Sequence, residues 1–165
     1  MIKDIKLIII FIILLIPSKS YSLIEVDITR GNLNPLPVAV SPIFSDKNSK
    51  DELKKELKID DVGVEISKVV ENNLKTTGLF NPLEKKAFLQ KPDVAHLKPR
   101  FEDWALIKAQ ALITGKVTYD DGKLRVEFRL WDVLAGKEIL ALAFTTVPNN
   151  WRRVGHIISD KVYER

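Results

Sequence analysis

Alternating apolar and polar residues in the second half of the chain predict three consecutive β-strands, over residues 112–119, 124–131 and 138–145. In the middle strand the apolar residues alternate with charged ones such as Arg125 and Arg129, which predicts one buried face and one wet face. Asp121-Gly122 and Gly136 supply the turn residues between the strands. The pattern therefore predicts an antiparallel meander.

Apolar residues recur with the period of a helix over residues 61–76, 101–109 and 149–165. The first of these helices is followed by Gly78, which fits a left-handed C-terminal cap. The last one has Asn149 or Asn150 available as its N-cap. It reaches Arg165 with no glycine or proline to stop it. We therefore expect either the first domain of a longer protein or the product of a truncated gene.

The remaining elements are less regular. Residues 36–40 are a short apolar run in which Pro37 fits a strand start or an edge, and residues 79–83 predict an extended segment or edge strand. Ser49 followed by Glu52 forms a capping-box pattern ahead of a charged stretch, which is either a short helix or a mobile loop. Together these elements predict an α+β fold: a mixed sheet with a three-strand antiparallel meander, and two to three helices packed on one face.

The first 22 residues have the layout of a secretory signal peptide. Two lysines precede ten unbroken apolar residues, Leu7 to Ile16, and Ser20 and Ser22 stand at the small-residue positions of a cleavage site. Ten helical residues span about 15 Å, half a bilayer core, so a retained membrane anchor is the less favoured interpretation. We predict cleavage before Leu23, with no stable membrane insertion afterwards.

Residues 23–34 follow the predicted cleavage site. Ile24, Val26 and Ile28 alternate with polar residues, which is the period of a half-buried strand, and Gly31 ends the pattern. This segment is either the first strand of the domain's own sheet or a flexible terminal strand free to pair with another chain. The α+β domain itself is predicted over residues 35–165.

Composition narrows the classes of protein further. A chain of 165 residues that is 45% hydrophobic and 29% charged fits one globular domain. It has no cysteine, which excludes disulfides, thiolate metal sites, cysteine nucleophiles and a lipid anchor on an N-terminal cysteine. Three lysines and one aspartate lie within residues 1–22, so the net charge of +4 falls to +2 without them. This charge gives no reason to expect nucleic acid as a partner.

Residues with catalytic or metal-binding chemistry are few. His96 and His156 are far apart and have no metal-ligand spacing, and no serine lies in a Gly-x-Ser-x-Gly elbow. Gly115-Lys116 lacks the flanking residues of a phosphate-binding loop. The acidic pairs 60–61 and 120–121 fit a helix start and a hairpin tip. The sequence therefore predicts no enzyme, no cofactor and no metal site.

Four stretches carry a family resemblance: LKTTGLFNPL at 74–83, LITGKV at 112–117, LWDV at 130–133 with GKE at 136–138, and WRRVGHIISDKVYER at 151–165. They resemble the N-terminal domain of the TolB family, and the resemblance spans residues 24–165 in the family's order. There are two departures. The family continues into a six-bladed β-propeller that has no counterpart here, and residues 45–58 look longer and more charged than the family's loop, which leaves their role open.

The resemblance implies a periplasmic protein-interaction domain of the Tol–Pal system, which supports outer-membrane integrity and constriction during cell division. In this family the strand after the signal peptide captures the C-terminal domain of TolA by adding to its sheet. The propeller binds the lipoprotein Pal, so Pal is expected as a partner only where a propeller is present. The residues that match the TolA-binding strand are Ile24, Glu25, Val26, Asp27, Ile28, Thr29, Arg30 and Gly31.

Two other functions compete with this interpretation. Some periplasmic regulators of peptidoglycan synthases have TolB-like α+β domains, but they are typically outer-membrane lipoproteins, and this chain has no cysteine to acylate. Domains related to anticodon-binding folds are similar in architecture only, and the export signal and small net charge argue against nucleic acid. The sequence leaves the oligomeric state open.

Overall fold

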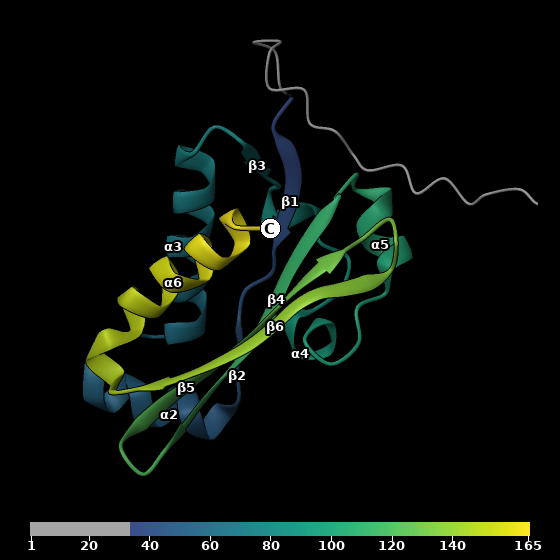
Figure 1. The fold of residues 1–165 in the computed structure, drawn as a ribbon. Coiled ribbons are helices and arrows are strands. Elements are labelled where there is room, and N and C mark those ends of the chain that lie inside the picture. The colour runs from purple at the N-terminus through teal and green to yellow at the C-terminus, as the bar shows by residue number, and fades with distance from the viewer. Residues whose placement is uncertain (1–33) are drawn as a thin grey trace, which may run out of the picture. The chain divides into compact units, whose positions relative to one another are not determined.

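The computed structural model describes residues 34–165. These residues form one mixed sheet of six strands, accompanied by five α-helices and two short 3₁₀ turns (Figure 1). The strands are β1 (Leu36–Val40), β2 (Phe44–Ser45), β3 (Phe80–Pro82), β4 (Ala111–Asp120), β5 (Lys123–Asp132) and β6 (Lys137–Thr146). The helices are α2 (Lys47–Leu57), α3 (Val62–Thr76), α4 (Pro92–Ala95), α5 (Phe101–Leu106) and α6 (Trp151–Tyr163), with 3₁₀ turns η1 (Lys85–Ala87) and η2 (Pro148–Asn150).

The strands lie in the order β3-β1-β4-β5-β6, and β2 adds to β4 off this path. The pairs of β1 with β3 and with β4 are parallel, whereas β4, β5 and β6 are joined antiparallel by hairpins. The first hairpin turns through Asp121 and Gly122, which have φ angles of 47° and 71°, the geometry that an Asp-Gly turn provides. The predicted α+β fold is confirmed, and each strand of the meander extends one residue beyond its expected limit at both ends.

Helices α2, α3 and α6 cover one face of the sheet and enclose the larger core. Figure 1 shows α6 lying beside α3 on this side. The strands contribute every second residue to the core, including Ile113, Val126 and Phe128, each at most 1% exposed. Burial of these side chains is the main source of stability in such a layer. Three helices on one face agree with the expectation from the sequence.

The opposite face carries a smaller core that the sequence analysis did not foresee. Ala39, Leu112 and Trp131 point to this side, where Trp104 from α5 and Ala95 from α4 pack against the sheet. The helix expected over 101–109 therefore lies on the opposite face from α3 and α6, and it ends at Leu106. Residues 84–99, which lead from β3 to α5, contain η1 and α4.

Helix α3 begins and ends close to the predicted positions. Asp61 is its N-cap, and its carboxylate accepts hydrogen bonds from the backbone N–H groups of Gly63 and Val64 at 3.1 and 3.3 Å. After the helix, Gly78 has a φ of 72°, which a glycine adopts at low cost. The acidic pair 60–61 thus serves partly as a helix cap, as expected.

The structure also decides the expectations for Pro37, for the N-cap of the last helix and for the edge strand. Pro37 is the second residue of β1, which lies between two strands, so it marks a strand start and not an edge. Asn150 precedes α6, yet its side chain makes no cap and donates to Thr146 Oγ1 at 3.1 Å. The predicted edge strand at 79–83 is confirmed as β3, at one end of the sheet. Within residues 34–165 no helix has both the length and the apolar character needed to cross a bilayer.

The charged stretch after Asp46 forms helix α2 and not a mobile loop, and its N-cap differs from the predicted one. The helix starts at Lys47, and Asp46, not Ser49, is the N-cap: its carboxylate accepts from the Ser49 backbone N–H at 2.9 Å. Ser49 is buried and accepts through Oγ from the Tyr119 backbone N–H at 2.9 Å. Leu53 is 1% exposed and anchors the charged helix to the core. The capping box failed because the serine hydroxyl is bonded to the sheet.

Replacing Asp46 with alanine is expected to lower the free energy of unfolding by about 1 kcal/mol at neutral pH, because a helix loses its cap. The hydrogen bond from the Ser49 backbone N–H, ahead of smaller contributions, holds the pKa of the Asp46 carboxyl below its ordinary value. A carboxyl whose pKa is lower in the folded state stabilises the fold above its unfolded pKa, and this contribution disappears as the pH falls through the folded value.

Urea unfolding of D46A and the parent chain should therefore differ at pH 7, and the difference should shrink as the pH falls through the lowered pKa of Asp46. Asp51→Ala, which removes an exposed carboxylate from the same helix, is the matched control and should shift stability by less than about 0.5 kcal/mol. An undiminished difference between D46A and the parent chain in acid would contradict this assignment of the cap.

Candidate functional site

The predicted partner-binding residues, 24–31, lie outside the described residues, as do the predicted signal peptide and its cleavage site. Their assignment therefore stays a prediction. Within residues 34–165, several charged side chains gather around a hollow on the outer face of the meander, on the side opposite α3 and α6.

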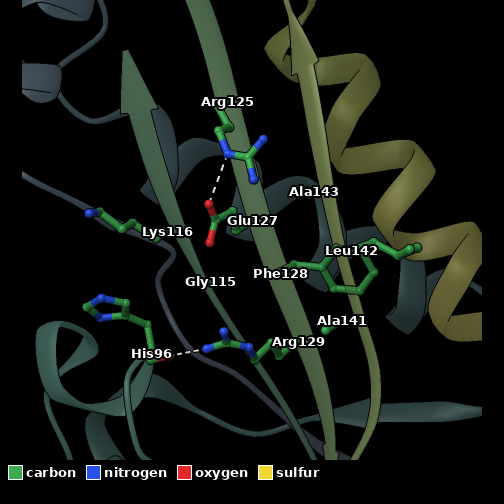
Figure 2. Close-up of a pocket in the computed structure, with 10 residues that line it drawn as sticks. All are labelled: His96, Gly115, Lys116, Arg125, Glu127, Phe128, Arg129, Ala141, Leu142 and Ala143. Atoms are coloured by element: carbon green, nitrogen blue, oxygen red, sulfur yellow. Dashed lines mark hydrogen bonds and ion pairs between the residues drawn. The ribbon is translucent and has the colours of Figure 1, made fainter. Parts of the chain in front are cut away.

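The hollow arises because neighbouring strands place large and small side chains on the same face. On this face β4 contributes Lys116, and β5 contributes Arg125, Glu127 and Arg129 at every second position. Strand β6 contributes alanines, with Ala143 opposite Glu127 and Ala141 opposite Arg129. The long side chains of β4 and β5 thus stand beside the short alanine side chains of β6, which leaves a hollow of about 210 Å³ (Figure 2).

Ion pairs fix the orientation of most of these charged groups. Arg125 Nε lies 2.9 Å from Glu127 Oε1, and Arg129 Nε lies 3.2 Å from Glu138 Oε2. Lys116 makes no ion pair with any residue in the described part of the chain. Three cations and the anion Glu127 line the hollow, and Glu138 pairs with Arg129 beside it. The cations thus exceed the anions by one, so the hollow favours an anionic ligand or side chain.

His96 lines one side of the hollow, but its contacts are structural. Its ring stacks on Phe44 with centroids 4.8 Å apart, and its Nδ1 lies 3.1 Å from the Pro92 carbonyl oxygen. Its own carbonyl accepts a hydrogen bond from Arg129 Nη1 at 3.0 Å, which Figure 2 shows joining α4's C-terminal end to β5. His96 thus holds the end of α4 against β2 and β5, at one side of the hollow.

His156 lies in a second, separate polar cluster, between α3 and α6. Asn73 Nδ2 is 2.8 Å from His156 Nδ1 and donates to Ser159 Oγ at 3.1 Å, and Ser159 in turn donates to the Gly155 carbonyl. The serine hydroxyl is thus engaged with the helix backbone, and its contact with Asn73 joins the two helices. Across residues 34–165 no three acidic or histidine side chains gather as a metal site would require.

A third polar contact ties α2 to the end of β4. The Tyr119 hydroxyl donates to Glu56 Oε2 at 2.6 Å, and this bond is the main reason that the pKa of the phenol is raised. The proton is held between a tyrosine and a carboxylate on the molecular surface, so the contact braces the helix against the strand. It offers no acid or base placed toward a cavity.

The comparisons with known proteins identify the family. The family model described as the TolB amino-terminal domain matches residues 24–139. The chain belongs to the TolB family. The Tol-Pal system protein TolB of Pelagibacter ubique (strain HTCC1062) is 76% identical over 159 residues, which are 96% of this chain and 35% of that protein. The chain thus spans about a third of the length of its TolB relative.

The chain also aligns with solved structures of other proteins. TolB from Acinetobacter baumannii aligns with 79% of this chain and 28% of its own at 18% identity, with a TM-score of 0.59. The C-terminal domain of LpoB from Salmonella enterica covers 71% of this chain and 86% of its own at 11% identity, with a TM-score of 0.49. The likeness to the TolB structure confirms an α+β architecture, as the sequence of this TolB-family chain predicted.

Sequence reasoning found some residues of the hollow and missed others. The alternation in 124–131 revealed that Arg125, Glu127 and Arg129 share a wet face. It gave no sign that His96 would lie beside them, because that contact depends on where α4 docks. The sequence does contain one signal for the hollow: Ala141 and Ala143 are small residues at alternate positions of one strand, so they lie on the same face.

Proposed function

We propose that this chain is a periplasmic, non-catalytic protein-interaction domain of the Tol–Pal system, and that it captures the C-terminal domain of TolA through residues 24–31. Through that contact it supports outer-membrane integrity and constriction during division. The observation that carries the proposal is that the family match begins at residue 24, so the whole segment lies inside the domain that defines the family. The 76% identity to a Tol-Pal system protein over nearly the whole chain supports it.

The physical basis is the addition of a strand to a partner's sheet. Ile24, Val26 and Ile28 fall on one face of an extended segment, and Glu25 and Asp27 fall on the other. In this binding mode backbone hydrogen bonds supply affinity, and alternate side chains select the partner. Ordering a short segment costs roughly 2–5 kcal/mol, so we expect a reversible complex with a Kd in the micromolar range.

Removing the segment should abolish capture. The chain from Leu23 is expected to retain the TolA C-terminal domain in a pull-down and to bind it in calorimetry. The chain from Asn34 should lose at least tenfold in affinity, because every backbone bond of the added strand disappears. The described core side chains all come from residues 38–162, so this shortening removes none of them. Equal capture by both chains would refute the proposal.

A pair of point variants tests the binding mode within the intact segment. Val26→Pro removes one backbone N–H from the added strand and should weaken TolA binding about tenfold or more. Val26→Thr keeps the N–H and the β-branched shape, and serves as the matched control, with a change of less than about threefold. Indifference of binding to the proline would argue for contact through side chains alone.

A further inference from the structure

The two edges of the sheet are protected very differently. At one edge, β3 has three residues and includes Pro82, and both features discourage pairing with another chain. At the other edge, β6 has ten residues and pairs only with β5 among the described strands. From Ile139 to Thr146 it contains neither a charge nor a proline. A long, uncharged edge of this kind is a template for a further strand unless something covers it.

The face of β6 that points toward the larger core specifies apolar residues in such a strand. Leu140, Leu142 and Phe144 pack against the core but stay half-buried, because the sheet ends with them. Phe144 stacks on Phe128 with ring centroids 6.0 Å apart, so its position is fixed. A further strand would complete the burial of this row only with aliphatic or aromatic residues on the same face.

The opposite face of β6 specifies acidic residues at the alternate positions. Ala141 and Ala143 are too short to cover the hollow, so the cations on β4 and β5 remain accessible across β6 (Figure 2). Diagonal neighbours across strands lie within reach of long side chains. A carboxylate on an added strand would therefore face Arg125 and Arg129, which already pair with Glu127 and Glu138. Lys116 lies behind them and has no ion pair within residues 34–165, so the cations still exceed the anions by one.

We propose that β6 accepts an extended strand from a partner protein, in which carboxylates alternate with aliphatic residues. The occupant pairs with the backbone of residues 140–146, beyond the irregularity that shifts the register at Leu130 and Trp131. Its aliphatic side chains pack beside Leu140, Leu142 and Phe144, and its carboxylates enter the hollow. This site is distinct from the segment 24–31: here the domain offers a sheet edge, whereas in the proposed function it offers a strand.

The test uses the chain from Leu23 and a fluorescent, end-capped eight-residue peptide of alternating valine and glutamate, titrated by fluorescence anisotropy. Saturable binding is expected, with slower amide exchange across residues 140–146. A peptide with lysine in place of glutamate should bind at least tenfold more weakly, because it places cations against cations. A peptide N-methylated at alternate residues should fail to bind, since it cannot complete the ladder.

Variants of the protein assign the charges. Lys116→Glu combined with Arg125→Glu should weaken the glutamate peptide about tenfold and improve binding of the lysine peptide. Arg153→Glu is the matched control, because Arg153 is an exposed cation on α6, against the other face of the sheet, and it should change neither affinity. Both sets of substituted side chains are at least partly exposed, so folding is expected to persist, and circular dichroism checks it.

Several outcomes would overturn the proposal. One is the absence of binding at millimolar peptide, and another is equal affinity for the N-methylated peptide. Binding without added protection of residues 140–146 would place the peptide elsewhere. Self-association of the chain that the peptide competes away would make a second copy, not a partner, the occupant. Loss of TolA capture by the chain from Asn34 is a separate measurement, so the two proposals can fail independently.

Discussion

Replacing Gly63 with alanine is expected to lower the free energy of unfolding by about 3 kcal/mol or more, enough to leave much of the chain unfolded at 37 °C. A Cβ atom at this position would lie 2.1 Å from the backbone oxygen of Ile43 and 2.8 Å from Ser45 Oγ. The first contact is with backbone, which no side-chain rotation can relieve. The helix or the segment before β2 would have to move.

Such a movement would break several contacts at once, because the start of α3 is bonded to that segment. Ser67 Oγ accepts a hydrogen bond from the Ile43 backbone N–H at 2.8 Å, and Ser45 Oγ donates to the capping carboxylate of Asp61 at 3.1 Å. Residue 63 is thus glycine because two backbones meet there. A steric clash is therefore expected to be accompanied by the loss of buried hydrogen bonds.

Urea unfolding followed by circular dichroism measures the effect. Asn72→Ala is the matched control, since it places alanine on an exposed position of the same helix and should shift stability by less than about 0.5 kcal/mol. A loss of less than about 1 kcal/mol for G63A would show that the helix can withdraw from Ile43 without cost, and the close approach would not be essential to the fold.

Local sequence patterns were sufficient for the elements that carry their own periodicity. The helical stripe of α3 and α6 and the strict alternation of β5 report directly which side chains are buried, because each depends on residues a few positions apart. The Asp-Gly hairpin is equally local, since Asp121 and Gly122 adopt the positive φ angles that the turn requires. The meander and the α+β class could therefore be predicted.

Contacts between distant segments could not be predicted from these patterns. Asp46 and Ser49 both suit a cap, and what decided between them was the Tyr119 backbone N–H, 70 positions from Ser49, which bonds its hydroxyl. Likewise, the docking of α5 on the opposite face depends on the smaller core around Trp104. Glycines at 63 and 155 inside helices were a usable signal, because a helix tolerates glycine where something packs closely.

The two candidate binding regions also differ in how far local sequence patterns could predict them. Residues 24–31 were proposed from a local alternation and a family resemblance, and the family match includes them. The hollow needed the sheet order as well. Arg125 and Arg129 belong to one strand, but Lys116 and the two alanines come from its neighbours on either side. Which strand lies at an edge of the sheet is a property of the whole topology. Only the structure therefore shows that the uncharged strand β6 lies at an edge.

Replacing Gln90 with leucine is the second substitution expected to have a large effect, of about 3 kcal/mol in the free energy of unfolding. Gln90 is 4% exposed. Its Oε1 accepts from Trp104 Nε1 at 3.0 Å and from the Arg100 backbone N–H at 2.9 Å, and its Nε2 donates to the Lys98 carbonyl at 2.9 Å. Leucine fills a similar volume but leaves these groups without partners, at roughly 1–3 kcal/mol for each one that stays buried.

The same contacts explain why the effect should be local at first. Gln90 joins the segment after η1 to the start of α5, so its loss should loosen α5 and the indole of Trp104 before the larger core on the opposite face is affected. Trp104 is 1% exposed and packs edge-on against Phe88. We therefore expect altered near-ultraviolet circular dichroism from this tryptophan, together with faster amide exchange in residues 98–106, while exchange in α3 changes less.

A double-mutant cycle isolates the hydrogen bond from the change in packing. Trp104→Phe removes the indole donor, so the cost of Q90L should be smaller by about 1 kcal/mol in that background. Gln110→Leu, at an exposed position before β4, is the matched control and should be nearly neutral. Equal costs of Q90L with and without the indole would show that Trp104 does not depend on Gln90, and α5 would then be held in place by apolar packing alone.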